Sequence, residues 1–124
     1  MMYNKTVQDC FFSPRHVGIV DLNQNFAVVY KNNQKDQGLI EFYLQCDQDA
    51  VIERACFKCN GNPYVIAALE WLCRLLEGKA INSLQPIDYQ VMIKELDIPV
   101  NQYPIALRII DVYQESLKLM KKKY

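Results

Sequence analysis

Apolar residues recur along this chain with two different spacings, and the change from one to the other predicts the order of the elements. From Tyr3 to Phe12 they share one face of a helix. Pro14 ends that helix, because a proline disfavours the helical conformation in the residue before it. Between Phe26 and Asn60, short apolar runs and alternation with a period of two are typical of strands. After Asn62 the helical spacing returns.

Three strands are predicted in the middle of the chain. The apolar run Phe26–Tyr30 forms the first, and the polar residues Lys31–Gln37 form the turn that follows it. Leu39–Cys46 and Val51–Asn60 form the second and third, with Asp47–Asp49 as the hairpin turn between them. The side chains predicted for the buried face are Ile40, Phe42, Leu44 and Cys46 in the second strand, and Val51, Ala55, Phe57 and Cys59 in the third.

Three helices follow the strands. Asn62-Pro63 opens one of them, with asparagine as the N-cap and proline at the first helical position, and Gly78 ends it. A shorter helix spans Ile87–Leu96. Pro104 opens the last helix, which continues to about Lys121 and ends in cations that complement the helix dipole. The prediction is an α+β fold, a small three-stranded antiparallel sheet with helices packed on one face.

Composition narrows the class of protein. The 124 residues suit a single domain, 1–124, and the 14 Lys and Arg residues balance 14 Asp and Glu residues. A net charge of zero provides no long-range field for nucleic acid or an anionic membrane. Apolar runs are far shorter than the ~20 residues that cross a bilayer, and no secretory signal opens the chain. We expect a cytoplasmic protein that binds neither nucleic acid nor membranes.

Candidate chemistry is sparse. The five cysteines are irregularly spaced, which favours reduced thiols over a disulfide framework. Cys56 and Cys59 have the spacing of a redox or zinc pair, but residues three apart in a strand point to opposite faces. His16 is the only histidine, and a lone loop histidine is typically a surface or capping residue. The carboxylates are scattered and no phosphate-binding loop is present, so these residues alone identify no active site.

Several segments resemble the IscU/NifU-type iron–sulfur cluster assembly scaffolds. Tyr3–Asp9 and Ser13–Gly18 are similar to the family's N-terminal helix, which ends in Asn-Pro-Arg-Asn-Val-Gly. The similarity resumes at Val51–Lys58 and closes with Glu95–Pro99 and a long final helix that contains Asp111. This resemblance covers nearly the whole chain, and it implies the same α+β fold that the apolar spacing predicts.

The resemblance also locates the family's ligands, which are three cysteines helped by an aspartate and a histidine. They hold iron or a [2Fe-2S] cluster while it is built. The matching positions here are Gln37 and Leu39 for the first cysteine and the aspartate, Asn62 for the second cysteine, and Pro104 and Ile105 for the histidine and third cysteine. Amides are poor iron ligands, and apolar side chains cannot ligate at all. The resemblance therefore implies a non-enzymatic, scaffold-like protein with no cofactor of its own.

Partner contacts follow from the same resemblance. Tyr3, Arg15 and Gly18 are retained, together with the basic C-terminal helix; in the family these flanks contribute to desulfurase binding and oligomer contacts. The chaperone-recognition stretch keeps Pro99 but lacks a second proline and a lysine. We expect an accessory or regulatory partner in cluster assembly, which binds a cysteine desulfurase, an intact scaffold subunit or a second copy as a homodimer.

Two alternatives remain open. One is a carrier whose metal or cluster site has moved to Cys59, Cys56 and His16, because Cys59 lies three residues before the lost second ligand. The other is a protein-interaction module in another pathway that kept only the fold. The three remaining cysteines fall on apolar faces, where they are explained as small buried side chains.

Overall fold

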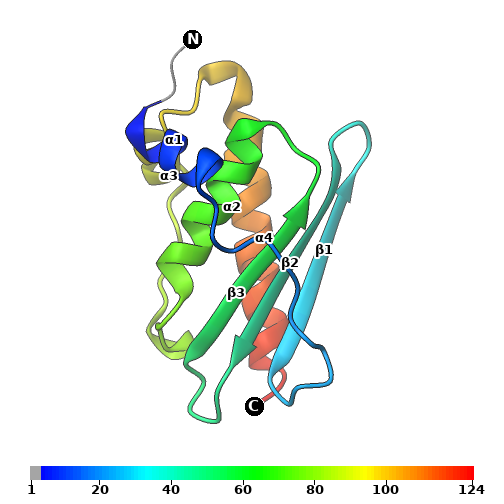
Figure 1. The fold of residues 1–124 in the computed structure, drawn as a ribbon. Helices are drawn as coiled ribbons and strands as arrows, with labels where there is room; N and C mark the ends of the chain where they lie inside the picture. Colours follow the sequence, from blue (N-terminus) through cyan, green and yellow to red (C-terminus); the bar gives the residue numbers. More distant parts are fainter. Residues whose placement is uncertain (1–3) are drawn as a thin grey trace.

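The computed structural model describes residues 4–124, and its elements follow the predicted order (Figure 1). The elements are α1 (Lys5–Phe12), β1 (Ala27–Gln34), β2 (Gly38–Cys46), β3 (Ile52–Cys59), α2 (Pro63–Leu76), α3 (Tyr89–Leu96) and α4 (Tyr103–Lys121). Two short 3-10 turns, Ile81–Ser83 and Val100–Gln102, precede α3 and α4. Along residues 4–124, no helix combines the length and the apolar character that crossing a membrane requires.

The strands form an antiparallel sheet in the order β1-β2-β3, with the helices packed on one face, which confirms the predicted α+β fold. Figure 1 shows α4 running along that face and α2 beside it. The largest fully buried side chains come from both layers and are Phe42, Phe57, Ile40, Leu44, Ile52, Leu69, Leu72, Leu76, Met92, Leu96, Ile109 and Met120. The segment between α1 and β1 crosses the other face of the sheet (Figure 1), where Val20, Ala27, Tyr43 and Cys56 form a second, smaller apolar cluster.

β1 is longer than predicted. The prediction ended the strand at Tyr30 and made its polar continuation a turn, but the strand runs to Gln34 and only residues 35–37 turn. Asn32 remains in the strand because its side chain is buried and bonded to α4: it accepts from Arg108 at 2.8 Å and donates to Asp111 at 3.0 Å. Tertiary hydrogen bonds therefore hold a polar sequence in a strand.

The apolar face of β3 is shifted by one residue at its start. The β2–β3 register slips between Gln45 and Cys46, because β3 carries one extra residue there as a bulge. Ile52 is consequently buried in the core, and Val51, which was predicted for that place, is only half-buried. The prediction for Val51 was wrong because period-two counting cannot detect a bulge.

Local capping signals were more reliable. The Asn62 Oδ1 atom accepts from the main-chain N–H groups of Tyr64 and Val65 at 2.9 and 3.1 Å, so α2 begins as predicted. Two other helices also have a capping side chain. Asn4 caps α1 by accepting from the main-chain N–H of Val7, and Asp88 caps α3 by accepting from that of Gln90. Each cap satisfies main-chain donors that the first helical turn leaves free.

Candidate functional site

Four of the five positions that the family resemblance singled out surround one hollow of about 480 Å³. Gln37 reaches it from the β1–β2 hairpin, Asn62 from the start of α2, and Pro104 and Ile105 from the first turn of α4. The rest of its lining comes from Gln34, Asn101, Gln102 and Arg108. Leu39 lies apart and lines a neighbouring hollow with Val17 and Cys59. The fold therefore assembles residues that are far apart in the sequence.

The side chains around this hollow do not suit iron or an iron–sulfur cluster. Gln37 and Asn62 present neutral amides, whereas Pro104 and Ile105 present no donor atom. Within residues 4–124, no three His, Cys, Asp or Glu side chains lie together in a way that could hold a metal ion. A cluster does not fit this donor set.

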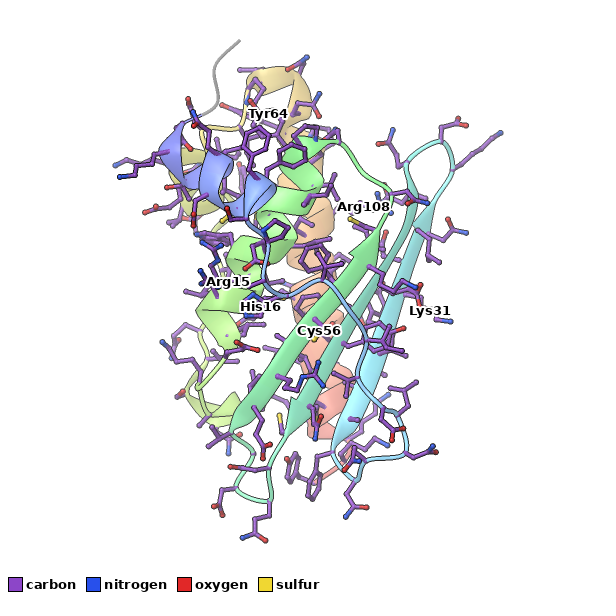
Figure 2. The ribbon with its side chains drawn as sticks, viewed as in Figure 1. Arg15, His16, Lys31, Cys56, Tyr64 and Arg108 are labelled. Atoms are coloured by element: carbon purple, nitrogen blue, oxygen red, sulfur yellow. The ribbon has the colours of Figure 1, made fainter. Side chains whose placement is uncertain are left out.

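Arg108 is the charged residue at the hollow, and it ties α4 to the β1–β2 hairpin. Its Nε and Nη2 atoms donate to the side chain and the main-chain carbonyl of Asn32 at 2.8 and 3.0 Å. Nη1 donates to the carbonyl of Gln37 at 3.0 Å, and Nη2 also donates to that of Gly38. Figure 2 shows Arg108 close to the end of the sheet where the hairpin lies. The residue is only 6% exposed, and burial lowers its pKa.

A hydrogen bond from Asn62 connects the starts of α2 and α4, the two helices that begin at the hollow. While Asn62 Oδ1 caps α2, its Nδ2 atom donates to Oε1 of Gln102, just before α4, at 3.1 Å. Together with Arg108, this bond links all three segments that carry the singled-out positions. The chain's own side chains thus hold these segments together.

His16 lies in a buried polar cluster, so its prediction as a surface or capping residue was wrong. Nδ1 is 2.6 Å from Oε2 of Glu70 and Nε2 is 2.7 Å from Oε1 of Glu77, and the side chain is only 11% exposed. The fully buried Glu70 also accepts from the main-chain N–H groups of Arg15 and His16, each at 2.9 Å. Figure 2 places Arg15 and His16 beside α2. Glu70 of α2 and Glu77, which follows the end of α2, therefore attach residues 13–22, the N-terminal segment, to the fold.

Further contacts fix the same segment. Arg74 donates to Glu70 at 2.7 Å and also to Asp9 of α1, whose pKa it lowers through the hydrogen bond and its charge. On the sheet side, the carbonyl of His16 accepts from the main-chain N–H of Phe57, and the carbonyl of Phe57 accepts from Gly18, both at 2.9 Å. The segment is thus bonded to α1, α2 and β3.

The cysteines and His16 do not form a relocated site within residues 4–124. Cys56 belongs to the cluster on the outer face of the sheet, whereas Cys59 packs against the main core, which confirms that the two point to opposite faces. His16 faces glutamates. The remaining thiols are buried, as predicted for small apolar side chains; they are Cys10, Cys46 and Cys73. Burial raises the pKa of Cys59 and raises that of Cys46 to about 11.

The partner positions have different surroundings. Arg15 is exposed, whereas Gly18 has a φ of 154° beside its hydrogen bond to β3. Pro99 precedes the 3-10 turn Val100–Gln102 and is half-buried. Tyr3 lies outside the described residues.

Two residues that matter here were missed by sequence reasoning. Arg108 was not considered, and Glu70 was counted only among the scattered carboxylates. Each stands in an apolar helical stripe, Arg108 between Ile105 and Val112 and Glu70 between Ala67 and Cys73. A charge at a core-facing helical position was the signal that could have identified both, because such charges are rarely buried without partners.

Comparison with known proteins places this geometry in context. The family described as "NifU-like N terminal domain" matches residues 2–124. The iron–sulfur cluster assembly scaffold protein IscU of Buchnera aphidicola subsp. Acyrthosiphon pisum is 27% identical, with 99% of this chain and 98% of that protein aligned. IscU of Escherichia coli K12 is 24% identical over 95% of this chain and 90% of that protein. The crystal structure of an N-terminal NifU-like protein from Brucella abortus superposes with a TM-score of 0.70 at 14% identity, covering 98% and 95% of the two chains.

Proposed function

Because this chain belongs to the family of NifU-like N-terminal domains, we propose that it is an accessory or regulatory protein of iron–sulfur cluster assembly that carries no cluster itself. The two IscU relatives are cluster assembly scaffolds by name. The observation that carries the proposal is the lining of the hollow, where Gln37, Asn62, Pro104 and Ile105 meet. Amides and apolar groups cannot replace the soft thiolates that hold iron and sulfur.

The hydrogen bonds around the hollow support this proposal. Ligands that share a metal also tie together the segments from which they come. Here Arg108 ties α4 to the hairpin, and Asn62 ties the start of α2 to Gln102. These segments therefore need no metal to stay together. The fold and its surface can form, and can bind a partner, without iron.

We propose that the partner is a cysteine desulfurase or an intact scaffold subunit and that the N-terminal segment contacts it. Three apolar side chains of this segment are between 49% and 60% exposed; they are Val17, Ile19 and Leu22, and Phe12 at the end of α1 is 68% exposed. The main chain on both sides of Val17 is nevertheless fixed, by the bonds of Arg15 and His16 to Glu70 and by the bonds of His16 and Gly18 to Phe57. A rigid backbone that displays apolar side chains suits a protein–protein contact, because little conformational entropy is lost on binding.

A binding titration tests this proposal. The purified chain is titrated with the desulfurase and the intact scaffold of its own organism by calorimetry. We expect one of them to bind, and the double variant V17D/I19D to bind at least ~10-fold more weakly, because charge on the contact must be desolvated. Val91→Asp is the matched control, since Val91 is 50% exposed on α3.

The outcomes separate the alternatives. Unchanged affinity in V17D/I19D would remove the N-terminal segment from the contact. Failure of the wild-type chain to bind either protein would overturn the partner proposal and favour an interaction module in another pathway.

A further inference from the structure

Arg108 is a buried cation without a carboxylate partner. Its four hydrogen bonds all end on neutral oxygens, which are the Asn32 side chain and the carbonyls of Asn32, Gln37 and Gly38. Within residues 4–124, no carboxylate oxygen lies within 4.0 Å of an Arg108 nitrogen, so Arg108 forms no ion pair there. Asp111 is connected to it only through the Asn32 amide. A buried charge without a counter-charge is costly, since neutral acceptors replace its hydration but do not balance its charge.

The Cys59 thiol does not supply the missing charge. Cys59 and Arg108 influence each other electrostatically. Burial nevertheless raises the pKa of the Cys59 thiol, although Arg108 acts in the opposite direction. Cys59 therefore stays protonated at neutral pH and leaves the guanidinium unpaired.

The hollow beside Arg108 is lined by groups that can donate hydrogen bonds to an anion. Its amide side chains are Gln34, Gln37, Asn62, Asn101 and Gln102, and no acidic residue appears in the described lining. The first turn of α4 also opens onto the hollow, and this helix has no capping side chain. The positive end of the helix dipole therefore faces the same space as Arg108.

We propose that this hollow binds a small oxyanion of the carboxylate or phosphate class, which serves as the counter-ion of Arg108. One of the two Nη1 hydrogens has no acceptor among the described residues, so it is available to the anion. Charge-assisted hydrogen bonds from a guanidinium are about twice as strong as neutral ones. The volume of about 480 Å³ admits an organic acid or a phosphate ester as well as the inorganic ion. This binding goes beyond the accessory role and does not depend on it.

Anion-dependent stabilisation of the full chain tests the proposal. Thermal unfolding is followed while sodium acetate or sodium phosphate is added, with sodium chloride keeping the ionic strength constant. A ligand that binds only the folded state raises the midpoint in a saturable way. We expect this response with acetate, phosphate or both, and the responding salt identifies the class of oxyanion. A response no larger than that to chloride for both salts would overturn the proposal.

Two variants locate the site. Arg108→Gln should lower the affinity for the anion at least tenfold. Arg54→Gln, which removes an exposed guanidinium from β3, should leave this affinity unchanged. Gln102→Glu places a carboxylate in the hollow and keeps the oxygen that accepts from Asn62, so it should abolish the response in a folded protein. Gln114→Glu adds the same charge to an exposed position of α4 as its control.

If Arg108→Gln does not fold, Gln102→Glu still tests the anion proposal. Retention of wild-type anion affinity in Gln102→Glu would contradict the proposal. Neither outcome involves iron or a protein partner, so anion binding is tested separately from the accessory role.

Discussion

At the scale of single residues, Glu70 connects α2 to the N-terminal segment. Its two oxygens accept four hydrogen bonds, from the main-chain N–H groups of Arg15 and His16, the His16 ring and the Arg74 guanidinium. All four join α2 to other parts of the structure or to the next helical turn. A fully buried carboxylate is stable only with such a set of partners, because each donor replaces part of its lost hydration.

Glu70→Gln is expected to destabilise the protein strongly. The amide nitrogen of the new glutamine would face a hydrogen-bond donor. Arg74 and His16 would also lose the carboxylate charge with which both interact. Breaking a buried charged pair costs ~3–5 kcal/mol in the free energy of unfolding. Urea denaturation measures this loss, with Glu115→Gln as the control, since Glu115 forms an exposed pair with Lys118 worth less than ~1 kcal/mol. A loss below ~1 kcal/mol in Glu70→Gln would refute the assigned role.

The buried thiols predict a loss of stability in alkaline solution. Burial raises the pKa of Cys46 from its ordinary value of 9.0 to about 11, so between these values the folded thiol keeps a proton that the unfolded one releases. The free energy of unfolding must then fall as the pH rises through this window, by up to ~1.4 kcal/mol per pH unit for each such thiol. Cys73 acts in the same direction.

Urea denaturation at about pH 8 and about pH 10 measures this effect. The variant Cys46→Ala removes one titrating group while keeping a small side chain. Its loss of stability between the two pH values should therefore be smaller than that of the wild type. An equal loss in both proteins would show that the Cys46 thiol does not titrate as described.

At the scale of elements, the start of α2 has a double function. Asn62 caps the helix and also donates to Gln102 beside the hollow. Asn62→Ala should lower the free energy of unfolding by ~1–2 kcal/mol, because a lost cap costs ~1 kcal/mol and the lost tie adds to it. Chemical denaturation against Asn60→Ala, an exposed asparagine of the same loop, measures the difference. Equal stabilities of the two variants would contradict this role.

The order of the elements was predictable because its signals are local. Asn62 and Pro63 mark a helix start within two residues, and the apolar period marks the face that packs. The end of β1 was not predictable in this way, because Asn32 is held by Arg108, which lies 76 positions along the chain. His16 is likewise explained by Glu70, which is 54 positions away. Errors therefore occurred where polar residues depend on distant partners.

The candidate site was predictable only in part. No local pattern indicates that Gln37, Asn62 and Ile105 meet; that expectation came from the family resemblance. The resemblance did not point to Arg108, because it directs attention to ligand positions. Period counting also failed at the β3 bulge, which arises from the pairing with β2. Identifying the closed site required the complete fold.

At the scale of the whole molecule, hydrogen bonds hold together the segments around the central hollow of this NifU-like fold. Arg108 and Asn62 connect the segments around the hollow, and Glu70 fixes the N-terminal segment that displays apolar side chains. The centre and the proposed contact surface are therefore maintained by separate sets of bonds. Binding to a partner is expected to survive changes in the hollow that leave the fold intact.

The proposal that this chain carries no cluster is tested by its iron content after anaerobic incubation with iron and sulfide. Two controls accompany the wild-type chain. The restored variant carries all five family ligands as Gln37→Cys, Leu39→Asp, Asn62→Cys, Pro104→His and Ile105→Cys. The second control is Cys59→Ala, which removes the first candidate for a relocated site.

We expect the wild-type chain to stay colourless and to hold far less than about one iron per chain, because its hollow offers no thiolate. The restored variant should gain the visible absorption of sulfur bound to iron. A wild-type chain that binds stoichiometric iron, with absorption that Cys59→Ala abolishes, would contradict the account.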